Sequence, residues 1–496
     1  MCPDPCKVSI WTQLRQRDLQ VFASWLSPPL IAQAARQVGI ALGSGPLNVA
    51  SLVWLALISA LHTTKNFADL LTLVLKLLKD DGDWGSSPLA ALERQGQQQR
   101  RRRRQRRRRS KHDPRGSDPC TVSEEAFVQA RQKLPWNFWT TLVMLLSDSF
   151  QQQHPEHVRW KRFRLLALDG TTINLPSWQR LTDHFGTAGK GKGRQRTQAR
   201  LVLMELPLVR MPWRYELTPL ADSERTVAAR LLSGLQRDDL VLMDRGFWSY
   251  ALFQQIAQQR GYFATRRIAQ AKLSRLKRLG RDDELVRFRP SHWHKAWTEA
   301  GWPREMTLRV IAYQIRGFRR SAVVTNLLDP QEVSREEWVR LAAVDEAGRV
   351  IEPGLYHRRW EIETSFRELK QTQGLEGSLR GRTPASIHFE VGGHLLLYLL
   401  VRWLLVEAAA DAEVADPLRL SFKGALEELR DMWQTLLHAK AEHVRRVLWP
   451  RLLGRIAGHE VPLRPGRHYK RPGDTQPKNK GRGRHQKPQK LARKSA

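Results

Sequence analysis

Three acidic residues stand at positions where carboxylates could meet in one site. Asp169 and Asp244 each end a short apolar run typical of a β-strand, and Glu363 lies in the helix-forming stretch 355–374. Any one of them alone is equally compatible with a turn or capping role. Three carboxylates in one cleft repel one another unless a divalent cation neutralises them, and oxygen ligands suit Mg²⁺ or Mn²⁺. Two such ions could activate a water or hydroxyl and stabilise the leaving oxygen in phosphodiester cleavage.

The stretch 355–374 predicts one amphipathic α-helix that begins after Gly354 and ends at Gly374. Its apolar residues share one stripe: Leu355, Ile362, Phe366 and Leu369. Beside that stripe, four polar residues fall within an arc of roughly 60°: Tyr356, Arg359, Glu363 and Lys370. A salt-bridged surface face is the alternative interpretation. The two upstream aspartates favour a functional site.

The two aspartates lie in a region that alternates strand and helix patterns. Apolar runs at 163–168 and 171–175 flank the turn signal Asp169-Gly170, which predicts a hairpin with Asp169 at its tip. We expect further strands at 199–206, 214–218, 240–243 and 262–265, and helices at 223–235 and 250–260. This pattern predicts a mixed α/β fold with carboxylates at strand ends, where open sheets place their sites.

Helical patterns dominate both flanks of this region. Residues 1–150 predict a helical region that binds DNA, and residues 411–463 predict a C-terminal helical region with a helix over 423–447. Residues 267–345 are mostly β in pattern and form an insertion before the helix of Glu363. Three tryptophans lie in the predicted loops of this insertion: Trp293, Trp297 and Trp302.

The charge of the chain indicates a polyanionic partner. Lys and Arg number 83 against 49 acids, a net formal charge of +34. Such an excess favours nucleic acid as the partner over an anionic membrane. Residues 100–109 contain nine arginines, and residues 464–496 are rich in Lys, Arg, Gly and Pro. Because like charges at this density repel, we expect a disordered basic loop at 100–116 and a disordered basic tail at 464–496.

Two apolar stretches bear on whether the chain enters a membrane. Residues 47–61 are too short for a span and residues 395–406 are interrupted by Arg402, so both predict buried helices. No basic-then-apolar signal begins the chain, so we expect a cytoplasmic protein. The cysteines fit a reducing compartment and show no metal-ligand spacing with histidines: Cys2, Cys6 and Cys120.

The spacing of the four polar helix residues resembles the Tyr-Arg-Glu-Lys signature of bacterial DDE transposases of the insertion-sequence-four type. The segment Leu-Asp169-Gly-Thr-Thr resembles the first catalytic segment of that family, and Leu-Met-Asp244-Arg-Gly-Phe resembles the second. Residues 123–134 are similar to its conserved N-terminal helix. The resemblance covers roughly residues 120–405, and chance matches at all three segments are improbable.

The resemblance implies a ribonuclease-H-like core in residues 160–266 and 346–410, with 267–345 inserted between the second aspartate and the glutamate. It implies catalytic residues that also hold two Mg²⁺ or Mn²⁺ ions: Asp169, Asp244 and Glu363. It implies contacts to DNA ends from Tyr356, Arg359 and Lys370. A tryptophan of the insertion would stack on a flipped base, with core packing as the alternative for each.

The same resemblance implies double-stranded DNA partners, namely the terminal repeats of a mobile element and its target DNA. Two ends must be brought together, so we expect a homodimer in a synaptic complex, associated with the bacterial nucleoid and not with a membrane. Family members commonly excise the element through a hairpin at its end. A catalytically silent DNA-binding relic and a metal-dependent nuclease without strand transfer are the alternatives. The intact acidic triad favours transposition.

We predict that deleting residues 100–109 weakens binding to every DNA duplex and flattens its salt dependence. The nine arginines neutralise phosphates and release counterions without reading sequence. Fluorescence anisotropy with unrelated duplexes at several salt concentrations measures both quantities. Unchanged affinity and an unchanged salt slope would reduce this loop to a linker.

Overall fold

The computed structural model describes residues 20–43, 47–64, 124–189, 195–315, 319–340, 343–344, 350–351, 353–439 and 441–462. The predictions of a basic loop at 100–116 and a basic tail at 464–496 therefore lie outside the described residues. The chain divides into two compact units, the first within Met1–Thr265 and Leu355–Leu463 and the second within Arg266–Gly354. Both combine helices and strands, so the prediction of a mixed α/β fold is confirmed.

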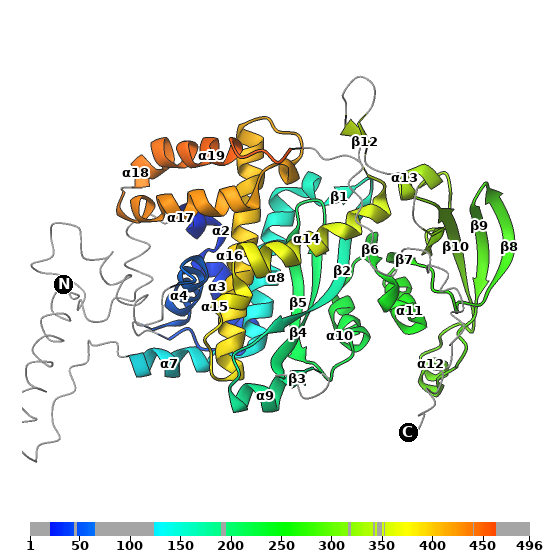
Figure 1. Cartoon of the computed structure of the whole chain (residues 1–496), viewed down its shortest axis with the longest axis horizontal. Coiled ribbons are helices and arrows are strands. Elements are labelled where there is room, and N and C mark those ends of the chain that lie inside the picture. The colour runs from blue at the N-terminus through cyan, green and yellow to red at the C-terminus, as the bar shows by residue number, and fades with distance from the viewer. Residues whose placement is uncertain are drawn as a thin grey trace, which may run out of the picture. The chain divides into compact units, whose positions relative to one another are not determined.

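The first unit is built on a mixed sheet in the order β5, β4, β2, β6, β7 (Figure 1). These strands are β2 (Phe163–Asn174), β4 (Arg196–Leu206), β5 (Met211–Pro219), β6 (Asp239–Met243) and β7 (Tyr262–Arg266). β4 pairs antiparallel with both β5 and β2, whereas β6 pairs parallel with both β2 and β7. Two short strands join the edges of this pattern: β1 (Arg159–Trp160) on β2 and β3 (Thr187–Ala188) on β4.

The predicted hairpin at Asp169-Gly170 is wrong, because β2 is one continuous strand. Asp169 pairs with Leu203 of β4, and Gly170 pairs with Val202. A Cβ on Gly170 would lie only 3.0 Å from the side chain of Glu224. The glycine therefore permits a close approach within a strand, where the sequence pattern predicted a turn.

The helices of the first unit surround α16 (Pro384–Asp411), which runs through its core (Figure 1). α16 packs most extensively against α4 (Val49–Leu61), α8 (Trp136–Gln153), α17 (Phe422–His438) and α19 (Trp449–Ala457). Alone among the described helices, α16 is long and apolar enough to cross a membrane, but its apolar segment is entirely buried inside the fold. It is thus a core helix, as predicted for residues 395–406. The remaining helices are α2 (Gln20–Trp25), α3 (Pro28–Gln37), α7 (Glu124–Gln132), α9 (Gln179–Phe185), α10 (Glu224–Leu231), α11 (Tyr250–Gln258), α15 (Leu375–Ser378) and α18 (Ala441–His443).

Two glycines in α16 allow its neighbours to approach closely. A Cβ on Gly392 would lie 2.6 Å from the indole of Trp139, and a Cβ on Gly393 would lie 2.6 Å from the carbonyl oxygen of Ala56. Real Cβ contacts are not this short, so α4 and α8 pack against the bare backbone of α16.

The stretch 355–374 is helical, but it is not the single regular α-helix that the sequence predicts. It begins as a 3-10 helix, η6 (Leu355–Trp360), continues as α14 (Glu361–Arg367) and widens into a π-helical turn, η7 (Glu368–Thr372). Gly374 ends it with a left-handed backbone, φ 86°. The number of residues per turn increases along this stretch, from the 3-10 helix to the π-helical turn. The narrow arc predicted for the four polar side chains assumed a regular α-helix and therefore does not apply.

Other predicted helices differ in length. The prediction at 223–235 shortens to α10, which a 3-10 turn follows (Leu232–Gly234). The prediction at 423–447 breaks at Ala439, where the backbone is extended, and helical turns then resume and reach Ala457. Both differences lie at helix ends, where local pattern is least informative.

The second unit contains an antiparallel sheet in the order β8, β9, β10, β11. Its strands are β8 (Leu273–Gly280), β9 (Asp283–Phe288), β10 (Met306–Tyr313) and β11 (Ser321–Thr325), and its shorter elements are α12 (Lys295–Glu299), α13 (Arg335–Val339), β12 (Ala343–Val344) and β13 (Val350–Ile351). Arg309 is fully buried and pairs with both carboxylate oxygens of Asp283, at 2.9 and 2.5 Å. This buried pair fixes β9 against β10.

The three tryptophans of the second unit form a half-buried cluster. Trp297 lies edge-on to Trp293 with ring centroids 5.4 Å apart and stacks on Trp302 at 5.8 Å. The indole N–H of Trp293 donates to the hydroxyl of Thr298 at 2.7 Å. His294 also packs edge-on against Trp297 at 4.5 Å, and Arg304 lies over the ring of Trp293 at 5.2 Å.

We predict that Gly393→Ala lowers the free energy of unfolding by about 1–3 kcal/mol, because the new methyl group overpacks the contact with Ala56. Alanine is the better helix former by about 1 kcal/mol, so propensity alone predicts the opposite sign. Gly454→Ala in α19 is the matched control, since nothing lies within 4 Å of its Cβ position. Urea denaturation measures both variants. A gain in stability in both would contradict the packing argument.

Candidate active site

Asp169 and Asp244 lie on neighbouring strands because of the register between β2 and β6. Leu168 pairs with Met243 in the parallel ladder, and the two aspartates are the next residues along each strand. Each carboxylate accepts a nearby backbone N–H, at 2.8 Å for Asp169 and 2.6 Å for Asp244. The structure therefore brings together two acids that are far apart in the sequence.

Glu363 reaches the same place from α14, which packs on β2. The link is Arg359, one helical turn earlier and only 4% exposed. Its Nη2 donates to Oε1 of Glu363 at 3.1 Å, and its Nη1 lies 3.6 Å from Oδ2 of Asp169. One guanidinium thus holds the glutamate of the helix and the aspartate of the strand around a common point.

The electrostatics of Asp169 reflect this crowding. Burial raises the pKa of Asp169 to about 6, Arg359 and the N–H of Gly170 act to lower it, and the nearby charges of Asp244 and Glu363 raise it further. A divalent cation among these oxygens would favour the ionised carboxylate, and hard oxygen donors are the ligands that Mg²⁺ and Mn²⁺ prefer. The three acids therefore fit such an ion.

The other residues of the predicted signature have different surroundings. Tyr356 is 1% exposed, and its hydroxyl donates to the carbonyl of Met243 at 3.1 Å, so it supports the strand end before Asp244. Lys370 lies farther along the helix in the π-helical turn, where its Nζ is 3.2 Å from Oε1 of Glu376. Tyr356 and Arg359 thus adjoin the acids, whereas Lys370 is paired elsewhere.

Sequence analysis missed a charged network on the opposite side of the helix. Arg210, in the turn between β4 and β5, pairs with Glu361 at 2.6 Å and with Glu368 at 3.3 Å. Arg402 of α16 pairs with Glu368, which also accepts from the hydroxyl of Tyr398 at 2.8 Å. The signal was present, because a seven-residue spacing places both glutamates on one helix face and Arg402 interrupts an apolar run.

Two further carboxyl groups were not predicted from the sequence. Glu224, at the start of α10, lies against Gly170 and pairs with Arg200 at 2.5 Å. On β4, burial raises the pKa of Glu205 to about 8, so this carboxyl is mostly protonated at neutral pH. Its charged neighbours are Arg210, Arg402 and Glu361. No local pattern marks either residue, because each depends on strand pairing between distant segments.

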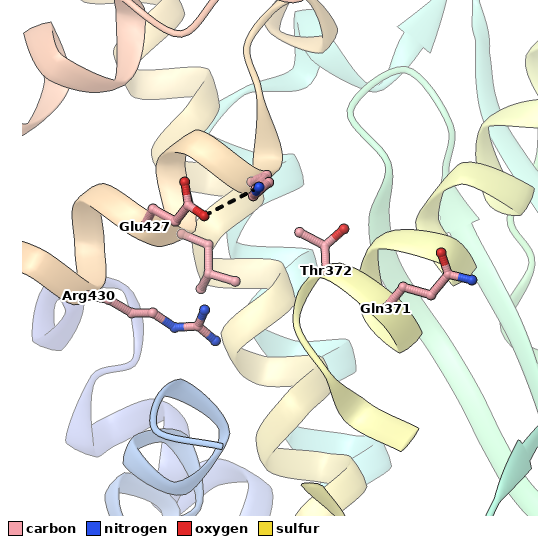
Figure 2. Close-up of a pocket in the computed structure, with 6 residues that line it drawn as sticks. Gln371, Thr372, Glu427 and Arg430 are labelled. Atoms are coloured by element: carbon pink, nitrogen blue, oxygen red, sulfur yellow. Dashed lines mark ion pairs between the residues drawn. The ribbon is translucent and has the colours of Figure 1, made fainter. Parts of the chain in front are cut away.

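A polar hollow of about 250 Å³ lies at the end of the same helix (Figure 2). Its lining comes from the π-helical turn and from α17: Gln371, Thr372, Lys423, Leu426, Glu427 and Arg430. Lys423 and Glu427 form an ion pair at 3.7 Å across one helical turn. None of the three acids lines this hollow, so it is separate from the candidate active site.

Comparison with known proteins agrees with this arrangement. A family model described as "Transposase DDE domain" matches residues 160–400, which include all three acids. The chain is 26% identical over 341 residues to "Transposase InsG for insertion sequence element IS4" of Escherichia coli (strain K12), covering 66% of this chain and 71% of that protein. A solved structure, "Cryo-EM structure of piggyBac transposase synaptic complex with hairpin DNA (SNHP)", aligns over 92% of this chain and 87% of that chain. Its TM-score of 0.35 and identity of 10% are too low to establish a shared fold.

We predict that Asp169→Asn stabilises the metal-free protein at pH 8 by up to about 3 kcal/mol. The unfolded carboxyl ionises near its ordinary pKa of 3.8 and the folded one near 6. Ionisation of Asp169 therefore lowers the free energy of unfolding as pH rises from about 4 to about 7. The amide of Asn does not ionise, so the variant does not lose this stability.

Chemical denaturation in EDTA at pH 4 and pH 8 measures this difference. Asp183→Asn is the matched control, because Asp183 is exposed and hydrogen-bonds only locally, to Gln179 at 2.7 Å. Equal stability of the Asp169 variant and the native protein at pH 8 would contradict a buried, mutually repelling set of acids.

Proposed function

Because the chain belongs to the bacterial DDE transposases of the insertion-sequence-four type, we propose that it cuts DNA at the ends of a mobile element and joins those ends to target DNA. The family makes it a DNA transposase, an enzyme of phosphodiester cleavage and transesterification. The observation that carries the site assignment is Arg359, held between Asp169 and Glu363 while the register of β2 and β6 puts Asp244 alongside.

The catalytic core in this proposal is ribonuclease-H-like and comprises residues 160–266 and 346–410. The sheet supports it, since an antiparallel trio (β5, β4, β2) continues into two parallel strands (β6, β7). Residues 267–345 form the β-rich insertion, and residues 411–463 form a C-terminal helical region. Residues 1–150 then supply a helical DNA-binding region.

Asp169, Asp244 and Glu363 are the residues that would hold two Mg²⁺ or Mn²⁺ ions in this proposal. Such ions activate the attacking water or hydroxyl and stabilise the leaving oxygen. The side chains of this protein set the geometry: the strand register fixes the two aspartates, and Arg359 orients Glu363. The network of Arg210 and Arg402 holds the helix from the other side.

DNA contacts are proposed for Tyr356, Arg359 and Lys370. Lys370 can exchange its partner Glu376 for a phosphate, because both are charged groups near the surface. Tyr356 and Arg359 are buried beside the acids in this state, so a direct contact with DNA requires η6 to move. The tryptophan cluster of the second unit offers the candidate for base stacking.

The reaction also has requirements beyond one chain. Two ends must be held together, so the proposal includes a homodimer that binds both terminal repeats in a synaptic complex. The net charge of +34 supports attraction to chromosomal DNA. The protein would then act in the bacterial cytoplasm, on the nucleoid.

We predict that Glu363→Gln lowers the rate of DNA cleavage by about 100- to 1,000-fold or more while leaving binding to DNA ends intact. The amide keeps the shape of the side chain but loses the charge that a divalent ion requires. The assay combines the protein, its terminal repeats, Mg²⁺ and supercoiled target DNA, and gels resolve cleaved, hairpin-ended and joined products.

Glu442→Gln is the matched control, because Glu442 is exposed on α18 and pairs only with Arg446 one turn away, at 3.2 Å. Joined products from the native protein support transposition. Cleavage without joining would identify a nuclease, and binding without cleavage would identify a silent relic. Undiminished cutting by Glu363→Gln would remove this residue from the site.

A further inference from the structure

A second cluster of metal-ligating side chains lies apart from the three acids, where α8 ends. His154 caps α8, Pro155 begins a 3-10 turn (Pro155–His157), and Glu156 and His157 complete that turn. One ligand atom from each of His154, Glu156 and His157 lies within 4.8 Å of the others. The rigid proline turn therefore gathers two imidazoles and a carboxylate within four residues.

The distances within this cluster suit a shared ion. Nδ1 of His154 is 3.8 Å from Oε1 of Glu156, and Nε2 of His157 is 3.7 Å from the same oxygen. Ligands about 2.0–2.1 Å from a tetrahedral ion are roughly 3.3 Å apart. Each contact with Glu156 would have to shorten by about half an ångström, and the two imidazole nitrogens, which lie within 4.8 Å of each other, by up to about 1.5 Å.

The second imidazole nitrogen of His154, Nε2, already has a carboxylate partner. Its Nε2 lies 3.5 Å from Oε1 of Glu407 in α16, and that oxygen also accepts from the indole N–H of Trp403 at 3.2 Å. The ring itself stacks on Phe150 at 4.9 Å. A carboxylate behind a histidine fixes the tautomer that leaves the other nitrogen free to bind a metal.

One oxygen of Glu156 faces both imidazoles, because its Oε1 lies 3.8 Å from Nδ1 of His154 and 3.7 Å from Nε2 of His157. The centroids of the two rings are 6.1 Å apart. A divalent cation placed among these atoms would be bound by two neutral imidazoles and one carboxylate.

From this geometry we propose that His154, Glu156 and His157 bind one Zn²⁺-type cation, with Glu407 as the carboxylate that orients His154. The donor set of two nitrogens and one oxygen selects Zn²⁺, Co²⁺ or Ni²⁺ over Mg²⁺. The site would tie the turn that follows α8 to α16, through His154 and Glu407. Three protein ligands leave the fourth position to a water.

The test uses the full-length, tag-free protein, stripped with EDTA and then equilibrated with Zn²⁺ at increasing concentrations. Equilibrium dialysis with elemental analysis is expected to find one fewer tight Zn²⁺ per chain in the double variant His154→Ala/His157→Ala than in the native protein. His443→Ala, an exposed histidine of α18, is the control and keeps the native stoichiometry. Glu407→Gln keeps the ion but binds it about 10- to 100-fold more weakly.

Three further readouts keep the proposal falsifiable. Zn²⁺ raises the melting temperature of the native protein and not that of the double variant, whose fold is checked by circular dichroism. If the double variant does not fold, His157→Gln replaces it with the same expected loss of Zn²⁺. An excess of Mg²⁺ leaves the bound Zn²⁺ in place. Equal Zn²⁺ stoichiometry in native and variant proteins, or displacement by Mg²⁺, would overturn the site.

Discussion

The repulsion among three carboxylates is the constraint around which the first unit is organised. Asp169, Asp244 and Glu363 come from two strands and a helix, and each would otherwise be pushed apart by the others. Arg359 counters this repulsion from a nearly solvent-free position between Asp169 and Glu363. Burial, more than the two neighbouring carboxylates, still raises the pKa of Asp169 to about 6 in spite of Arg359.

The helix of Glu363 is fixed from both sides by charge. Arg359 faces the acids, while Glu361 and Glu368 engage Arg210 and Arg402 on the opposite face. A buried ion pair adds little net stability, but losing one partner is costly because the other charge stays buried. Such a network specifies one position of the helix more than it strengthens the fold. The π-helical turn Glu368–Thr372 begins at Glu368, the residue that pairs with both arginines.

The sequence was most informative where the chemistry is local. Strand-end acids, the helix of Glu363 and the buried apolar helices could all be predicted from short patterns. The hairpin predicted at Asp169-Gly170 was wrong because this dipeptide is common in turns but also suits a strand. Here the glycine leaves room for the side chain of Glu224. The partners of Arg210 could not be predicted, since a turn between two strands meets the helix only after the sheet has formed. The cluster at His154 is local in sequence but was not predicted, because the contact with Glu407 that sets it apart from an ordinary turn comes from a distant part of the chain.

The close fit of α4 against the glycines of α16 has a consequence for synthesis on the ribosome. α4 ends at Leu61, and most of the chain is made before α16 begins at Pro384. At about 5–20 residues per second, the apolar surface of α4 waits roughly 15–60 s for its partner. During that interval the nascent chain exposes the apolar surface of α4 that faces α16 in the folded protein. A gene copy truncated before the codon for Pro384 would encode a chain in which α16 never covers this surface.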